Sequence, residues 1–321
     1  MVDFFFVLSG FVLTRAFWTE RRAPQFLRNV QARVARMYPL HVATLCIVAV
    51  LQGYLVMRLA AAPFIYRYND TYHFALNALL LNGSGLQQGF SFNAPAWSIS
   101  TEFLVNVAFL GLIALPPKFA RIGLALLGAV AIATMATRGL INGTRAFAFI
   151  DNDLVRTGAG FMVGVAAAAG QSRVRWSLPR WGNDLLALLI VASGSLYLAS
   201  RGLWSNVGDL LLCFVGFPVL VLSVTGSAWL RSALRTRPLV YLGEISYSIY
   251  LMHFPLQLVL HVASLRMGFS LPVESRIFFA AFIGVVILVA SFTHRFIELP
   301  GKRRLMPRAL VGREGGQDRA A

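Results

Sequence analysis

The sequence predicts an all-α fold, a polytopic membrane helical bundle of about nine transmembrane helices. Three observations support this class. The chain is 57% hydrophobic and 13% charged, whereas about 25% of residues are charged in soluble domains. Nine apolar segments are each long enough to cross roughly 30 Å of hydrocarbon as a helix. The loops between these segments alternate in their content of basic residues.

The basic residues also predict the orientation of the bundle, because Lys and Arg are retained in the cytoplasm during insertion. If the loop after the first segment is cytoplasmic, 20 of the 29 Lys and Arg residues fall on the cytoplasmic side, eight fall on the other side, and Arg15 lies within the first segment. We therefore expect a multi-pass protein with a cytoplasmic C-terminus. The cytoplasmic set comprises Arg21, Arg22, Arg28, Arg33, Arg36, Lys118, Arg121, Arg173, Arg175, Arg180, Arg231, Arg235, Arg237, Arg295, Lys302, Arg303, Arg304, Arg308, Arg313 and Arg319.

A net charge of +16 is a feature that many nucleic-acid-binding proteins share. Here the charges are spread over five loops instead of one face, so membrane topology explains them and we expect no nucleic-acid partner. They would also favour anionic lipid headgroups. The two cysteines, Cys46 and Cys213, both lie in apolar runs, which predicts neither a disulfide framework nor a zinc site.

The helices are expected, in chain order, at 2–19, 37–59, 97–116, 119–138, 154–170, 184–200, 207–225, 239–262 and 275–297. Each is about 17–24 residues long, which matches the thickness of a bilayer core. The fourth begins after Pro116-Pro117, because proline ends the preceding helix. The longest extramembrane stretch is 60–96. Its apolar run Phe74–Leu81 is too short to span, so we expect it to be re-entrant or interfacial.

The first expected helix has two further features. Its Ser9-Gly10 pair is a small-residue notch suited to close helix packing, and Asp3 is a candidate helix N-cap. The helix begins without a polar lead-in or a signal peptide, and the charge alternation places Met1 outside the cytoplasm. We therefore expect that a preceding helix is missing.

The expected domain organisation is simple. One transmembrane domain, N-terminally incomplete, covers 1–300, and a basic cytoplasmic tail without stable structure covers 301–321. No internal repeat and no soluble second domain are visible in the sequence.

Ionisable residues are costly inside a membrane, so each is a candidate for function. Glu102 lies five residues into the helix 97–116, and His253 lies about 21 Å along its helix from Leu239. The two helices enter from opposite sides, so both residues belong in the outer half of the membrane. A carboxylate and an imidazole at matched depth can share a proton there. Each could instead satisfy a buried hydrogen bond that ties helices together.

Arg33 and Arg36 come just before the second helix, at a spacing that puts them on one helical face. Two guanidiniums on one face can clamp a phosphate, although spacing alone favours a simple positive-inside anchor. His41 could join such a site or be structural. Tyr247 and Tyr250, three residues apart, could face one cavity or simply pack as aromatics.

Several familiar catalytic motifs are absent. The sequence has no Walker A loop, no G-x-S-x-G elbow and no H-E-x-x-H. None of its five histidines is followed by Asp five positions later, which excludes the H-x4-D motif of glycerolipid acyltransferases. We expect no metal site and no bound cofactor.

Several stretches, in order along the chain, resemble acyltransferase family 3, the integral-membrane O-acyltransferases of the O-antigen and Nod-factor acetylase type. Residues 2–11 read VDFFFVLSGF and resemble its G-V-D-x-F-F-V-L-S-G-F. Residues 33–39, RVARMYP, match its R-x-x-R-I-Y-P, and residues 97–102, WSISTE, match its W-S-L-S-x-E. Residues 243–255, GEISYSIYLMHFP, match its G-x-I-S-Y-x-I-Y-L-x-H-x-P, and residues 298–300, ELP, resemble its closing E-x-P.

The resemblance implies a bundle of about ten helices in a bacterial inner membrane. It implies an acyltransferase for groups other than amino-acyl groups. The enzyme would move an acyl group, expected to be acetyl, from cytoplasmic acyl-CoA to a hydroxyl of an envelope polysaccharide, lipid-linked sugar or similar glycan. Arg33 and Arg36 become the expected contacts of the CoA phosphates, and Glu102 and His253 become the catalytic candidates. Residues expected to support the cavity are Ser98, Ser246, Tyr247 and Tyr250.

Two alternatives remain open beside the transferase. The family has a further N-terminal helix that carries an Arg and the histidine taken as general base, so the chain as given is expected to be an inactive fragment. A carrier that moves a lipid or lipid-linked sugar without chemistry would also use buried charges, although such proteins more often show repeats and paired broken helices. The acceptor, the acyl chain and the oligomeric state cannot be read from the sequence.

Overall fold

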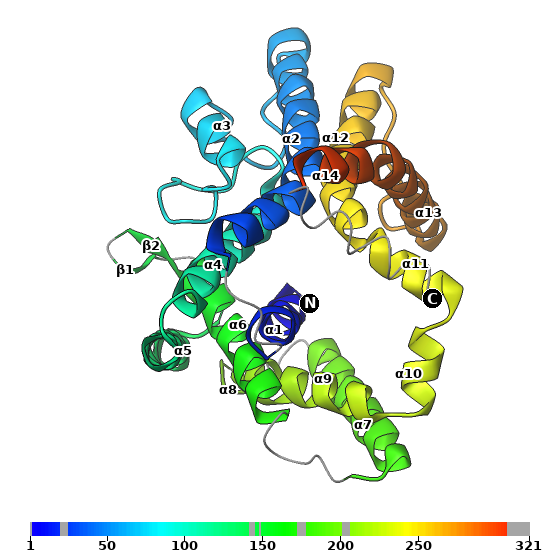
Figure 1. Ribbon diagram of the computed structural model, residues 1–321. Helices are drawn as coiled ribbons and strands as arrows, with labels where there is room; N and C mark the ends of the chain where they lie inside the picture. Colours follow the sequence, from blue (N-terminus) through cyan, green and yellow to red (C-terminus); the bar gives the residue numbers. More distant parts are fainter. Residues whose placement is uncertain are drawn as a thin grey trace. The chain divides into compact units, whose positions relative to one another are not determined.

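The computed structural model describes residues 2–19, 25–140, 145–147, 149–171, 178–200 and 206–306. Within these ranges the regular structure is helical apart from one short hairpin, in which β1 (Arg145–Phe147) pairs antiparallel with β2 (Ile150–Asp151) (Figure 1). Seven helices of the described part are long and apolar enough to cross a membrane. The predicted all-α polytopic class is confirmed.

The seven spans are formed by uninterrupted helices or by helices joined through a π or 3-10 turn. They comprise α2 (Phe26–Leu59), η2 (Ala94–Ala96) with α4 (Trp97–Ile113), α5 (Pro117–Arg138), α7 (Arg180–Ala199), the run of α8 (Asn206–Leu211), η3 (Leu212–Gly216) and α9 (Phe217–Gly226), α12 (Ser246–Met267), and the run of α13 (Arg276–Thr293), η4 (His294–Glu298) and α14 (Leu299–Leu305). The other described helices are α1 (Val2–Leu13) with η1 (Thr14–Thr19), α3 (Thr71–Ala78), α6 (Asn152–Gln171), α10 (Trp229–Leu234) and α11 (Arg237–Glu244).

Local chemistry explains several helix ends. Pro117 opens α5, where its missing N–H costs nothing. The Ser275 hydroxyl caps α13 by accepting a hydrogen bond from the Phe278 N–H at 3.3 Å. Gly268 ends α12 in the left-handed conformation, with φ of 69°, which glycine adopts without a steric penalty. These ends depend only on neighbouring residues in the sequence.

Three boundaries differ from the expectation. Helix α2 begins at Phe26 instead of 37 and continues through Pro39. The helix expected at 239–262 divides at Ile245 into α11 and α12, where the Ser246 hydroxyl donates to the Gly243 carbonyl oxygen at 2.8 Å and competes with backbone hydrogen bonding.

The third difference concerns the C-terminal tail, expected to lack structure from its start. Residues up to Leu305 are helical in α14, because Gly301 packs against Pro39 and the Gln31 amide donates to the Leu305 carbonyl oxygen at 3.2 Å. Residues 307–321 lie outside the described part. The same is true of several expected cytoplasmic cations, namely Arg21, Arg22, Arg173, Arg175, Arg308, Arg313 and Arg319.

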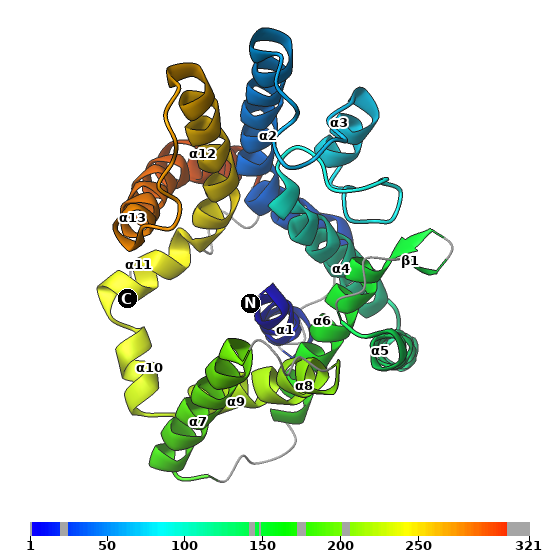
Figure 2. The ribbon, with the colours of Figure 1, turned by 180° about the vertical axis from the view of Figure 1, so that it is seen from behind.

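The chain forms two compact units. The first unit comprises residues 1–26 and 104–240, and the second comprises residues 27–103 and 241–321. Each unit therefore combines an early and a late part of the chain. Helices α2, α12 and α13 of the second unit lie side by side in both views (Figures 1 and 2).

In the first unit, α1 and α6 pack so closely that glycine is required at the crossing. A side-chain carbon at Gly10 would overlap the Phe161 backbone, and one at Gly164 would overlap the carbonyl oxygen of Val7. Small residues at such crossings let helix backbones approach each other. The predicted packing role of Gly10 is confirmed.

A buried ion pair joins the same two helices. The Asp3 carboxylate accepts hydrogen bonds from Nε and Nη2 of Arg156 at 2.6 and 2.7 Å, and Asp153 lies 3.6 Å from Nη1 of Arg156. Asp3 was expected to cap its own helix, but its carboxylate is used to neutralise an arginine of α6. A charge left unpaired in such a site would carry a large desolvation cost.

The core of the second unit lies between α2, α12 and the segment that leads into α4. One cluster of buried side chains contains Met37, Leu40, Ile99 and Leu251. A second cluster, further along α2, contains Leu45 and Val48 of α2 together with Phe254 and Leu258 of α12. These contacts fix the register of α2 against α12 and thereby position the polar residues between them.

The glycine crossing leads to a first prediction. Gly164→Ala should destabilise the protein by about 1–3 kcal/mol, because α1 and α6 must separate to make room for a methyl group. Thermal unfolding in detergent, followed by size-exclusion chromatography, measures the loss. Gly158→Ala and Gly170→Ala on the same helix are matched controls, since added carbons there meet nothing within 4 Å. Equal melting temperatures for all three variants would contradict the close crossing.

Candidate functional site

The candidate site lies in the second unit, and its first component is the arginine pair on α2. Arg33 is half-buried and Arg36 is exposed, one turn apart on the same helix. The charge of Arg33 lies close enough to interact with both Arg36 and the carboxylate of Glu102. The carboxylate of Glu102 offsets part of the repulsion between the two neighbouring guanidiniums, and two guanidiniums on one helical face form a donor set that suits a phosphate.

Glu102 is buried on α4, with 7% of its surface exposed. It lies one turn beyond Ser98, whose hydroxyl is 2.8 Å from the Tyr250 hydroxyl. Tyr250 in turn donates to the Pro95 carbonyl oxygen at 2.7 Å. These bonds hold the start of α4 against α12 and thereby fix the position of Glu102.

Tyr247 ties α12 to α2. Its hydroxyl donates to the carbonyl oxygen of Met37, and its side chain lies within electrostatic range of Glu298, Glu102 and Arg36. The sequence left open whether Tyr247 and Tyr250 line a cavity or pack as aromatics. In the structure each uses its hydroxyl to bridge α12 to another element.

The register between α4 and α12 separates the two catalytic candidates. The Asn93 amide donates to the Leu251 carbonyl oxygen at 3.1 Å, and Ser98 meets Tyr250, so the two segments run antiparallel. Glu102 is then level with Tyr247, and His253 lies six residues further along α12, about 9 Å at 1.5 Å per residue. This register places Glu102 closer to the arginine pair than to His253, and their expected matched depth in the membrane stays a prediction.

His253 has a defined orientation. Its Nδ1 donates to the Tyr250 carbonyl oxygen, which leaves the lone pair of a neutral ring on Nε2. Among the residues that the structure describes, no side chain or backbone group bonds to Nε2. The ring is half-buried. A neutral imidazole with one nitrogen held and the other available can accept a proton from a hydroxyl group.

A third polar cluster lies where α13 continues into η4. The buried carboxylate of Glu298 accepts hydrogen bonds from the Ser248 hydroxyl at 2.7 Å and from Nδ1 of His294 at 3.0 Å. The motif at 298–300 indicated Glu298, but no pattern indicated Ser248 or His294. The spacing of four residues between His294 and Glu298 is the one signal in the sequence that could have suggested their contact.

Ser246 does not join these contacts. It is exposed, and its hydroxyl serves the turn before α12. Ser248, two residues later, points to the buried side because two residues turn a helix by about 200°. The role expected for Ser246 in the cavity stays a prediction, and Ser248 provides the buried hydroxyl.

Two further histidines of this unit, His41 and His73, make structural hydrogen bonds. His41 is buried and its Nε2 donates to the Asn77 carbonyl oxygen at 2.8 Å. His73 uses both ring nitrogens, since Nδ1 donates to Asp70 at 2.8 Å and Nε2 accepts from the Gln88 N–H at 3.3 Å. In the described part of the chain, no three His, Cys, Asp or Glu side chains gather as metal ligands.

Comparison with known proteins gives one match. A family model described as an acyltransferase domain matches residues 1–295. No curated protein and no solved structure matches the chain.

The Asp70–His73 contact gives a second prediction, on pH. Asp70 caps α3, and hydrogen bonds from the His73 N–H and ring hold the pKa of its carboxyl below the ordinary value of 3.8. A carboxyl whose pKa is lowered by folding stabilises the fold above its unfolded pKa and loses this contribution as pH falls through the folded value. Amide exchange of residues 71–78, corrected for intrinsic rates, should therefore show less protection at about pH 2 than at about pH 5.

The matched control is Asp70→Asn, which can still cap the helix but does not titrate. Its protection of α3 should be the same at both pH values. A wild-type protein that behaves like this variant would show that the Asp70 charge does not stabilise α3.

Proposed function

The chain belongs to acyltransferase family 3 and is a membrane acyltransferase, and from this premise we propose its reaction. It transfers an acyl group, which we take to be acetyl, from cytoplasmic acyl-CoA to a hydroxyl of an envelope polysaccharide, lipid-linked sugar or similar glycan. The enzyme works in a bacterial inner membrane with its C-terminus in the cytoplasm. It uses acyl-CoA as a co-substrate and needs no bound cofactor.

The observation that carries this proposal is the placement of two chemistries in one unit. The arginine pair offers two guanidiniums beside Glu102 at one end, and His253 offers an available Nε2 about two turns of α12 beyond Tyr247. The phosphates of CoA would bind Arg33 and Arg36, and the extended pantetheine arm would carry the thioester along the unit toward His253.

The proposed chemistry is a direct transfer. The acceptor hydroxyl attacks the thioester carbonyl while Nε2 of His253 takes the hydroxyl proton, and the C–S bond breaks as the new ester C–O bond forms. The proton on His253 then neutralises the departing CoA thiolate. A general base of this kind contributes about 10²–10⁴-fold to the rate. The Tyr250 carbonyl accepts from Nδ1 and so stabilises the imidazolium that forms.

Glu102 has a different role in this proposal from the one expected for it. It is a positioning residue that balances the charge of Arg33 and orients its guanidinium toward the phosphates. Tyr247 and Tyr250 hold α12 against α2 and the start of α4. Ser248 and His294 hold the Glu298 carboxylate, which adds a second negative charge near Tyr247.

The third prediction tests the arginine pair and the histidine separately. Arg33→Lys should weaken acyl-CoA binding by about tenfold or more, because Lys cannot form the bidentate fork and one charge-assisted hydrogen bond contributes about 1.5–3 kcal/mol. His253→Gln should lower kcat by about 10²–10⁴-fold while acyl-CoA binding stays normal. Two quantities are measured on the purified protein in nanodiscs. One is the affinity for acyl-CoA, and the other is the rate at which free CoA is released in the presence of a soluble sugar acceptor.

Arg58→Lys is the control, because Arg58 is an exposed arginine at the other end of the same helix. If Arg33→Lys binds acyl-CoA normally, the arginine pair does not bind the CoA phosphates and serves only to anchor the helix at the membrane surface. Transport of a lipid-linked sugar without release of CoA would favour the carrier.

The fourth prediction concerns topology. In a variant without Cys46 and Cys213, Gln88→Cys should react with an impermeant thiol reagent in intact cells. Lys118→Cys and Arg237→Cys should react only after the membrane is opened, because basic residues stay in the cytoplasm. All three side chains are exposed in the structure. Labelling of position 118 or 237 from outside would reverse the proposed orientation.

A further inference from the structure

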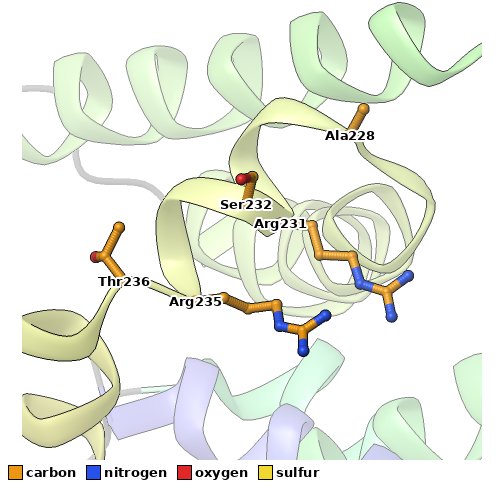
Figure 3. A pocket seen from close by; sticks show the side chains of 5 residues that line it. All are labelled: Ala228, Arg231, Ser232, Arg235 and Thr236. Carbon is orange, nitrogen blue, oxygen red and sulfur yellow. The ribbon is translucent and has the colours of Figure 1, made fainter. Parts of the chain in front are cut away.

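The first unit carries a basic hollow that the proposed reaction does not use. It has a volume of about 420 Å³ and is lined by Ala228, Arg231, Ser232, Arg235 and Thr236. Figure 3 shows the Arg231 and Arg235 side chains extending in the same direction from α10. This arrangement follows from their spacing of four residues, which places them on one helical face.

A second hollow adjoins the first. It has a volume of about 450 Å³, and it shares Ala228 and Arg231 with the first hollow. It adds Arg180, from the start of α7, and the hydroxyl side chains Thr225 and Ser227. Among the described residues, no carboxylate lines either hollow. The hydroxyls of Thr225 and Thr236 already donate to backbone carbonyl oxygens, so the three guanidiniums are the main donors around the two adjoining spaces, and guanidiniums suit phosphate oxygens.

An acidic residue of α7, Asp184, is hydrogen-bonded to the backbone at the start of α10. The Asp184 carboxylate accepts hydrogen bonds from the N–H groups of Ala228, Trp229 and Leu230, at 3.4, 3.3 and 2.9 Å. It thereby fixes the start of α10 against α7. This attachment of α10 helps to hold Arg231 and Arg235 in place. The Asp184 carboxylate already accepts hydrogen bonds from three backbone N–H groups.

The surroundings of the hollows are those of a membrane boundary. Trp229 on α10 is 63% exposed and Trp181 on α7 is 71% exposed. Exposed tryptophans beside arginines are typical of the level of lipid headgroups. Trp229 lies on α10 with Arg231, and Trp181 follows Arg180 at the start of α7, which suits a ligand that has both an anionic headgroup and apolar chains.

We propose that the two hollows form one binding site for an anionic phospholipid, with a phosphate of the headgroup in each hollow and Arg231 shared between them. A headgroup that carries two phosphates, as in cardiolipin, fits this arrangement better than a headgroup with one. The acyl chains would extend along the surface beside Trp181 and Trp229. The site is separate from the arginine pair of the second unit and does not depend on the proposed reaction.

The test reconstitutes the full chain in vesicles of phosphatidylcholine with minor fractions of cardiolipin and phosphatidylglycerol, and counts the retained lipids by native mass spectrometry. Wild-type protein should retain cardiolipin preferentially. Arg231→Gln with Arg235→Gln should lower this retention by about 10- to 30-fold, from about 1 kcal/mol for each basic residue at a membrane surface. Lys118→Gln with Arg121→Gln removes the same charge from exposed positions of the same unit and should change little.

A second variant tests the hollow without changing its charge. Ser232→Leu fills the first hollow and should also reduce cardiolipin retention, even if the arginine variant does not fold. Unchanged retention in Ser232→Leu, or an equal loss in the Lys118 and Arg121 variant, would overturn the site. Equal retention of phosphatidylglycerol would overturn the assignment of one phosphate to each hollow. Displacement of the lipid by millimolar inorganic phosphate would identify a site for soluble anions instead.

Discussion

A charge in hydrocarbon costs several kcal/mol unless a partner neutralises it, and each unit of this protein is arranged around the few charges that it buries. In the first unit, the Asp3–Arg156 pair joins α1 to α6 at the same interface where Gly10 and Gly164 permit contact between backbones. In the second unit, Glu102 balances Arg33, and Glu298 is held by Ser248 and His294. The helices cannot shift along one another without separating these partners.

The second unit uses the same constraint for function. Tyr247 and Tyr250 satisfy backbone carbonyl groups of α2 and of the segment before α4, so the polar contacts that close the bundle also fix the depth of each functional side chain. The same unit thereby holds the two guanidiniums of the arginine pair and, further along α12, an imidazole with one available nitrogen.

The first unit carries its exposed charge differently. Its basic hollows lie on the same elements as the exposed Trp181 and Trp229. The arginine pair of the second unit interacts with the carboxylate of Glu102, whereas no carboxylate of the described residues lines the hollow of Arg231 and Arg235. The two units therefore place their arginines in different electrostatic surroundings.

The sequence by itself determined the all-α membrane class, the approximate positions of most of the long helices and the membership of Arg33, Arg36, Glu102 and His253 in recognisable motifs. These properties depend on apolar length and on neighbouring residues, which are local. Only the tertiary structure decided that Glu102 lies within electrostatic range of Arg33, that Ser248 and not Ser246 is buried, and that Asp3 pairs with Arg156. It also decided that the helix expected at 239–262 divides at Ile245. Apolar length fixes how far a helix spans the membrane but leaves its rotation and its register against neighbours open, and side-chain partnerships depend on both.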